Sequence, residues 1–159
     1  MRKFTKSACV FLIAFLTSGI IAYEFPTYTL QKKNSALYTS SSLLEFHNQE
    51  RLRYGKSKLS IDGNLTSAAQ MHADWMSKNK TLSHKGENGS SIKDRVGSGY
   101  IVYGENIAYG QKSEKEVFRA WMNSSGHKKN ILNSYFKRVG FGSHRSESGV
   151  LYWCVVFGA

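Results

Sequence analysis

Two residues that can do chemistry stand out in small and apolar surroundings. Glu105 lies in the segment 103–110, Tyr-Gly-Glu-Asn-Ile-Ala-Tyr-Gly, and His84 follows a serine 21 positions earlier. A carboxylate that stays charged in such surroundings needs a hydrogen-bond donor or a cation as its partner. An imidazole that folding brings near it can exchange a proton with it or share a metal ion. We therefore expect His84 and Glu105 to mark the functional site.

A third residue extends this pair into a candidate metal site. His127 lies three positions after Ser124, near the end of a long helical pattern. Zinc sites usually use three or four protein ligands, and an open site adds water. His84, Glu105 and His127 are therefore our candidate ligands for Zn²⁺ or another divalent cation, although a structural His–Glu hydrogen bond remains the alternative. Asn106 and Ser124 are candidate cleft residues beside them.

The serines near these histidines do not indicate a serine hydrolase. No nucleophile-elbow pattern surrounds them, and no other hydrolase motif is present. We therefore assign no catalytic residue from the sequence.

Local start and stop signals predict the helices that position these residues. Capping-box spacing recurs at Ser42 with Glu45, at Ser91 with Asp94 and at Ser113 with Glu116. A further helix follows from apolar residues at helical spacing after a turn at 62–63. Helices are expected at 43–54, at 65–79, after Ser91 and after Ser113, the last interrupted at 125–127 and resumed at 130–132.

Strand patterns gather near the carboxyl end. Residues 138–143 alternate apolar side chains with glycine, and residues 150–157 are rich in β-branched and aromatic side chains, with a hairpin turn expected at 147–149. A further strand at 100–103 would lead into the Glu105 segment. We predict an α+β fold, a three-layer α-β-α sandwich with a small antiparallel sheet between helices.

The chain divides into three parts. Residues 1–22 have a basic start and an apolar run, which is typical of a secretory signal peptide, with an uncleaved anchor as the alternative. Residues 23–40 hold the only proline and show no periodicity, so we interpret them as a tether. Residues 41–159 form the folded domain. The protein is therefore expected to be secreted, either to the extracellular space or to the periplasm.

Cysteine content and charge argue against a disulfide-stabilised domain and against a specific nucleic-acid-binding protein. Removal of the signal takes away Cys9 and leaves Cys154, so no internal disulfide can form, and Cys154 is best interpreted as a buried small hydrophobe. The formal charge of +11 includes three basic residues of the signal, which leaves +8 on the exported part. Because the basic residues are scattered, we expect no specific nucleic-acid partner, and transient membrane or envelope contact is the alternative.

Six segments taken together resemble the CAP superfamily, the SCP-like family of cysteine-rich secretory proteins, venom allergens and plant pathogenesis-related proteins. They run in order through residues 41–159 and most resemble the bacterial type without disulfides. The segments are 47–51, 59–73, 82–84, 104–108, 121–127 and 152–157.

The resemblance implies an α-β-α sandwich and a secreted protein. In the eukaryotic branch, two histidines and two glutamates in a central cavity can bind a divalent ion. His84 and Glu105 match the first histidine and the first glutamate. Ser124 and Leu151 stand where the other two ligands would be. The resemblance therefore supports the cleft more strongly than it supports the metal.

We favour a secreted, non-catalytic binding module, expected to be monomeric, whose cleft takes a small or lipid-like ligand. The resemblance suggests a lipid or sterol, with a divalent ion as a further candidate. The first alternative is a metal-dependent, protease-like hydrolase in which Glu105 acts as the general base. The second is a surface-interaction protein at the envelope or on a host.

Overall fold

The computed structural model describes residues 42–159. The predicted signal peptide at 1–22, the predicted tether at 23–40 and Cys9 lie outside the described residues. No helix in the described range has both the length and the apolar composition needed to cross a membrane.

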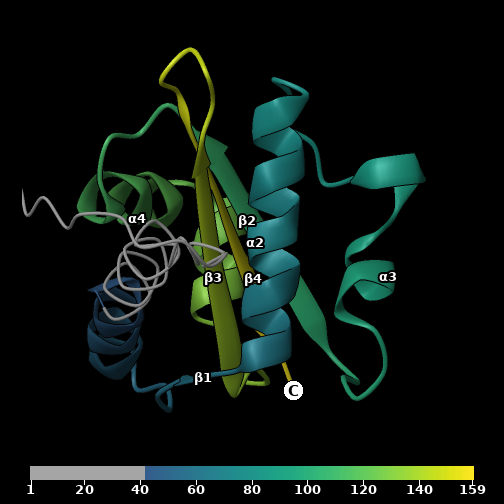
Figure 1. Ribbon diagram of the computed structural model, residues 1–159. Coiled ribbons are helices and arrows are strands. Elements are labelled where there is room, and N and C mark those ends of the chain that lie inside the picture. The colour runs from purple at the N-terminus through teal and green to yellow at the C-terminus, as the bar shows by residue number, and fades with distance from the viewer. Residues whose placement is uncertain (1–41) are drawn as a thin grey trace, which may run out of the picture.

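A four-stranded sheet forms the middle of the molecule (Figure 1). Its strand order is β1-β3-β4-β2, so β2 is an edge strand. The central strands pair antiparallel, whereas the two-residue β1 runs parallel to β3. The predicted antiparallel sheet is therefore a mixed one. The strands are β1 (Ser60–Ile61), β2 (Tyr103–Tyr109), β3 (Arg138–Arg145) and β4 (Leu151–Gly158).

Helices cover both faces of this sheet. The long helix α2 (Gly63–Lys78) crosses one face, and the short α3 (Ile92–Val96) lies on the same side (Figure 1). The other face packs against the helix of residues 42–53, α4 (Glu114–Asn123) and α5 (Ser125–Ile131). A 3₁₀ turn, η1 (Glu87–Gly89), precedes α3. The predicted α-β-α sandwich is confirmed.

Strand β4 supplies side chains to both hydrophobic cores because successive residues of a strand point to opposite faces. Trp153, Val155 and Phe157 face the core shared with α4 and α5, where Trp121 is also buried. Tyr152, Cys154 and Val156 face the core under α2. The expectation of a buried, unpaired Cys154 is confirmed.

Two glycines of β3 let α2 lie unusually close to the sheet. A Cβ atom at Gly140 would fall 2.0 Å from the backbone nitrogen of Thr66, and one at Gly142 would fall 2.4 Å from the carbonyl carbon of Ala69. Any side chain at these two positions would push helix and sheet apart. The alternation of glycine with Val139 and Phe141 therefore reflects a helix contact as well as a strand.

The predicted helix ends are mostly correct because their signals are local. Asp62 caps α2 by accepting hydrogen bonds from the N–H groups of Asn64 and Leu65, and Ser91 and Asp94 form the expected capping box. Ser113 caps α4. The expected interruption at 125–127 is wrong: Ser124 has extended backbone angles, and α5 begins at Ser125.

The strand expected at 100–103 is also displaced. β2 covers the Glu105 segment itself, and each of its residues pairs with one residue of β4. Gly104 and the polar pair after it have a loop-like composition, but the glycine makes room for the ring of Phe136, which would lie 2.8 Å from a Cβ there. Glu105 thus belongs to a rigid strand.

Candidate functional site

Glu105 is a buried carboxylate on the edge strand β2. Its side chain is 4% exposed. It points toward the α2 side of the sheet, the same side as Ile107 two residues later. Burying a charge is costly unless it is paired, so the neighbours of Glu105 determine what the site can do.

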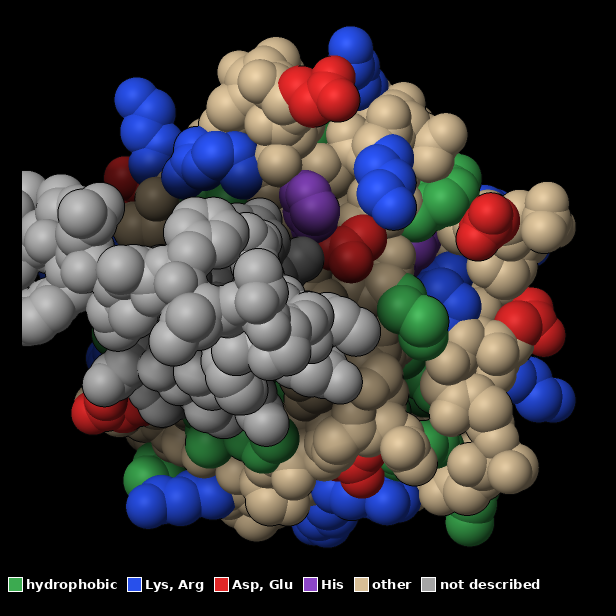
Figure 2. Space-filling view, viewed as in Figure 1, with side chains coloured by type: hydrophobic (Ala, Val, Ile, Leu, Met, Phe, Trp, Pro, Cys, Tyr) green, Lys and Arg blue, Asp and Glu red, His purple; other side chains and the backbone are tan. Residues whose placement is uncertain are grey.

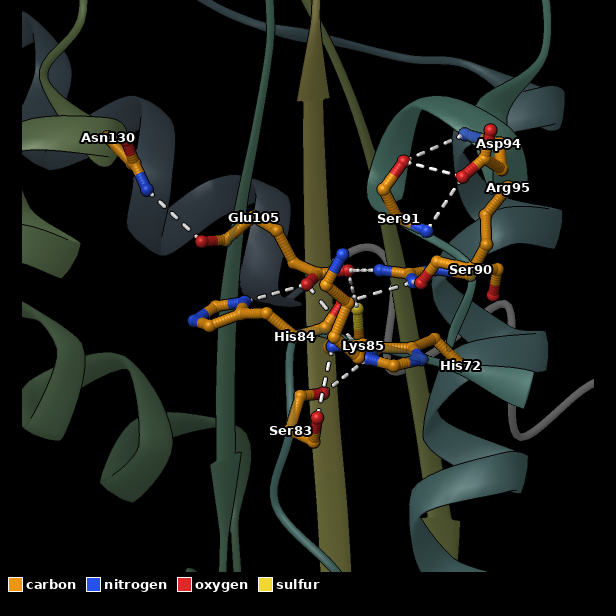
Figure 3. Close-up of polar contacts among 11 residues, drawn as sticks. His72, Ser83, His84, Lys85, Ser90, Ser91, Asp94, Arg95, Glu105 and Asn130 are labelled. Atoms are coloured by element: carbon orange, nitrogen blue, oxygen red, sulfur yellow. Dashed lines mark hydrogen bonds and ion pairs between the residues drawn. The ribbon is translucent and has the colours of Figure 1, made fainter. Parts of the chain in front are cut away.

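His84 is the first partner of Glu105, as predicted. It lies in the loop after α2, and its Nδ1 atom is 2.8 Å from Oε1 of Glu105 (Figure 3). An ionised carboxylate can only accept hydrogen bonds, so Nδ1 of His84 must be the donor. In the neutral ring, Nε2 then carries a lone pair. The side chain is 62% exposed, so that lone pair is open to a ligand.

Arg95 is the second partner, and sequence reasoning missed it. From α3, its Nη2 atom donates to Oε2 of Glu105 at 2.5 Å, while Nη1 donates to the carbonyl oxygens of His84 and Ser90 (Figure 3). The predicted short helix after Ser91 and the need of Glu105 for a cation were the available signals. They could not show that the two meet.

These contacts keep Glu105 ionised. Burial alone would raise the pKa of its carboxyl group, but the hydrogen bond from His84 and the charge of Arg95 outweigh burial and bring the pKa below its ordinary value. A carboxylate of this kind holds its charge and gives up its lone pairs to fixed donors. It orients His84 and is a poor proton acceptor.

Two further buried groups line the same position. The Nε2 atom of His72 donates to the carbonyl oxygen of Ser83 at 2.8 Å and lies 3.9 Å from Oε1 of Glu105. The thiol of Cys154 donates to Oε2 of Glu105 at 3.6 Å. Burial lowers the pKa of His72 and raises that of Cys154, so both groups are neutral near pH 7. The contact of the buried His72 with Glu105 was not predicted.

Asn106 points to the other side of β2, toward α5. Its amide donates to the carbonyl oxygen of His127 at 3.0 Å. Asn130 completes the link by donating to Oδ1 of Asn106 at 2.8 Å and to the carbonyl oxygen of Glu105 at 3.1 Å. This amide chain fixes the strand that carries Glu105.

His127 and Ser124 lie outside the pair formed by His84 and Glu105. His127 belongs to α5, and its pKa is lowered by burial and by the charge of His84, so the two imidazoles lie within electrostatic range. Ser124 is the break between α4 and α5, where its N–H donates to the carbonyl oxygen of Trp121.

These residues are poorly arranged to bind one divalent metal ion together. Across residues 42–159, no three or more His, Cys, Asp or Glu side chains form a group that could hold a metal ion. Both oxygens of Glu105 already accept hydrogen bonds, from His84 and from Arg95. The free lone pair of the His84–Glu105 pair is on Nε2 of His84. It can accept a proton or a hydrogen bond from a hydroxyl group, or it can bind a metal ion as a single ligand.

A second imidazole–carboxylate pair occurs elsewhere in the fold. The Nδ1 atom of His144 on β3 lies 2.5 Å from Oδ1 of Asp74 on α2. Figure 2 shows the basic side chains spread around the visible face of the molecule, as the sequence indicated.

This chain is similar in sequence to a protein of Bacillus subtilis. The chain is 37% identical over 130 residues to the uncharacterized protein YkwD of Bacillus subtilis, and the match covers 76% of this chain and 51% of YkwD. The chain thus spans about half the length of that relative.

Two solved structures are similar to the described fold. One is an extracellular protein containing an SCP domain from Bacillus anthracis, with a TM-score of 0.68, 26% identity, and coverage of 74% of this chain and 39% of that one. The other is an outer surface protein from Borrelia burgdorferi, with a TM-score of 0.71, 22% identity, and coverage of 76% and 92%.

The family model described as the cysteine-rich secretory protein family, CAP, matches residues 44–157. That range includes the sheet, the helices on both faces and the His84–Glu105 pair. The chain therefore belongs to the CAP family, in its disulfide-free bacterial form.

Proposed function

We propose that this CAP domain is a secreted, non-catalytic binding module whose ligand contacts Nε2 of His84. The observation that carries the proposal is the hydrogen bond between Nδ1 of His84 and Glu105, which orients an exposed imidazole. The thiol of Cys154 beside Glu105 is buried with a raised pKa, so it is a poor nucleophile, and the carboxylate is held by Arg95. Binding is the role that this arrangement serves best.

The open lone pair of His84 indicates the ligand chemistry. It accepts a hydrogen bond, so it selects a ligand with a hydroxyl or another donor group. Leu82, two residues earlier, is a large apolar side chain with 44% of its surface exposed. A donor group on an apolar body, as in a sterol or another lipid-like molecule, matches both features. We take a sterol as the first ligand to test.

Secretion and surface contact complete the proposal. The apolar segment at 1–22 supports export, as do similar structures whose proteins are described as extracellular or as an outer surface protein. The scattered +8 charge of the exported part supports brief contact with an envelope or membrane. If the ligand of His84 is part of a host or envelope surface, this binding module acts as a surface-interaction protein.

A binding titration with a fluorescent sterol tests the proposal. His84→Ala should weaken binding by about tenfold or more because the hydrogen-bond acceptor is lost. His144→Ala is the matched control, since it removes the other imidazole paired with a carboxylate, and it should leave the affinity unchanged. Equal affinities for wild type and His84→Ala, or no binding of sterols and of a lipid panel, would refute the proposal.

A more specific form of the proposal is that the ligand is a metal ion. His84 and His127 would bind it through ring nitrogens, and Glu105 would orient His84 through its hydrogen bond. Calorimetry with Zn²⁺ on wild type and on His84→Ala measures it. Heat that is lost in the variant would support it, whereas equal and negligible heats would remove it.

A hydrolase is the second candidate, favoured by the same hydrogen bond because a carboxylate commonly orients a general base. The lowered pKa of Glu105 makes that carboxylate an unsuitable base, so His84 would have to take the role. Turnover of peptides or esters that His84→Ala abolishes would establish this function, and its absence across a broad panel would exclude it.

A further inference from the structure

The buried charge of Glu105 is balanced by one permanent cation. Arg95, 8% exposed, donates to Oε2 of Glu105, whose own side chain is 4% exposed. The other close groups are neutral near pH 7: burial lowers the pKa of His72, so it carries no positive charge, and raises the pKa of Cys154, so it carries no negative charge. His84 is largely in solvent, where water and salt screen any charge that it carries.

Arg95 is held in a fitted position, unlike a solvated surface arginine. Its Nη1 atom donates to the carbonyl oxygens of His84 and Ser90, at 3.2 and 2.9 Å. Gly86 leaves the necessary space, since a Cβ atom there would lie 3.1 Å from Nη1 and 2.8 Å from Oγ of Ser90. One guanidinium thus fixes the carboxylate and the backbone of the histidine it orients.

A divalent cation at Glu105 would have to compete with this guanidinium. Both would need the same carboxylate oxygen, and their like charges would repel at short range in a poorly solvated site. Without the guanidinium, Oε2 of Glu105 would be free to bind a cation, and the sulfur of Cys154 lies 3.6 Å from that oxygen.

We propose that Arg95 is the permanent cation of this site, that it takes the place of a divalent ion beside Glu105, and that it thereby disfavours metal binding there. The inference concerns the charge of the site and does not depend on the ligand being a sterol. Its failure would leave the sterol titration untouched, and the reverse is also true.

Thermal unfolding and Zn²⁺ titration of the full chain test this inference. Wild type should show no Zn²⁺-dependent rise in Tm that Glu105→Gln removes. Arg95→Met should unfold at a lower temperature in chelator, because its carboxylate is left without a partner, and should regain stability in Zn²⁺ with binding about tenfold or more tighter than wild type. Arg95→Met combined with Glu105→Gln should lose the response to Zn²⁺.

A second arginine provides a matched control. Arg138 pairs with Asp62 at 3.3 Å, but it is 39% exposed, and Asp62 also accepts bonds from Tyr100 and from the first turn of α2. Arg138→Met should therefore show no Zn²⁺ response. Arg95→Lys keeps the charge and should likewise show no Zn²⁺ response, whereas its Tm should fall because lysine cannot make all three hydrogen bonds of the guanidinium.

Two results would overturn the inference. One is a wild-type protein that binds Zn²⁺ as tightly as Arg95→Met through Glu105. The other is a folded Arg95→Met that ignores Zn²⁺. If Arg95→Met fails to fold in chelator, refolding yield replaces Tm as the readout: Zn²⁺-dependent recovery supports the inference, and equal failure with and without Zn²⁺ overturns it.

Discussion

At the scale of single residues, the hydrogen bonds that Glu105 accepts determine what the site can do. Its oxygens receive hydrogen bonds from His84 and Arg95, so its charge is used inside the protein. The group left for a partner is the imidazole of His84. A carboxylate that appears in the sequence as a ligand or base is therefore an orienting group in the fold.

The amide of Asn130 gives a prediction at this scale. Asn130→Ala removes the donor to the carbonyl oxygen of Glu105 and to Oδ1 of Asn106, so both acceptors lose a partner. The free energy of unfolding should fall by about 1–3 kcal/mol. Denaturant unfolding measures this loss.

Asn133→Ala is the comparison for this change. The Oδ1 atom of Asn133 accepts only an exposed bond from the N–H of Tyr135, so its loss should cost less than about 1 kcal/mol. Equal costs for the two variants would show that the link from α5 to β2 does not hold the strand in place.

At the scale of elements, the site depends on how closely helices and strands approach one another. α2 rests on the glycines of β3 and carries His72, while α3 carries Arg95 to the other side of the same carboxylate. The edge strand β2 is held by β4 on one side and by the amides of α5. The position of His84 follows from these contacts, since it lies in the loop that leaves α2.

Gly142→Ala tests the close approach of α2. A methyl group there would lie 2.4 Å from backbone atoms of α2, which cannot move away as a flexible side chain could. We expect the free energy of unfolding to fall by about 1–3 kcal/mol, the usual range for overpacking. Denaturant unfolding again provides the measurement.

Gly126→Ala is the matched control for that variant. Gly126 lies in α5, and a Cβ atom there would meet nothing within 4 Å. Alanine should leave stability unchanged or raise it by about 0.5–1 kcal/mol. A Gly142→Ala protein as stable as Gly126→Ala would contradict the packing described here.

The elements that sequence reasoning found are those with local signals. The capping pairs at Ser91 and Ser113 lie within a few residues of the helices they begin, so the helix starts were predictable. β2 was displaced in the prediction because its pairing partner, β4, lies far along the chain. Arg95 is only ten residues from Glu105, but it was missed because no local signal shows that α3 folds back onto β2.

At the scale of the whole molecule, two cores on either side of one sheet carry the fold without a disulfide in the described residues. The core under α4 also contains a buried polar residue. His47 donates from Nδ1 to the carbonyl oxygen of Leu43 at 2.7 Å and is surrounded by aromatic rings, among them Phe118, Trp121 and Phe141. Such a ring must stay neutral while the protein is folded.

His47 therefore predicts a loss of stability in mild acid. Burial, reinforced by the charge of Arg51, lowers its pKa from 6.5 to about 4, despite the bond to Leu43. Between these two values the unfolded chain binds the additional proton, so the free energy of unfolding falls as pH drops from about 6.5 to about 4. The full loss is about 3 kcal/mol.

Denaturant unfolding between about pH 7 and about pH 4.5 measures this slope. His47→Phe keeps an aromatic ring without a titrating nitrogen and should reduce the slope over this range, whatever its effect on stability at neutral pH. The slope that remains comes from His72 and His127, whose pKa values burial also lowers. The lowered pKa values of Glu105 and Asp62 add a further loss at lower pH, as these carboxylates become protonated. A wild-type slope that His47→Phe leaves unchanged would assign the effect to other groups.

The protonation state of the His84 ring is the most direct test of the central claim, that Glu105 orients His84 so that Nε2 faces the ligand. Long-range ¹H–¹⁵N NMR of the imidazole, recorded where the ring is neutral, distinguishes its two tautomers. We expect the tautomer protonated at Nδ1 in wild type, and a shift away from it in Glu105→Leu. A neutral His84 protonated at Nε2 in the wild-type protein would contradict it.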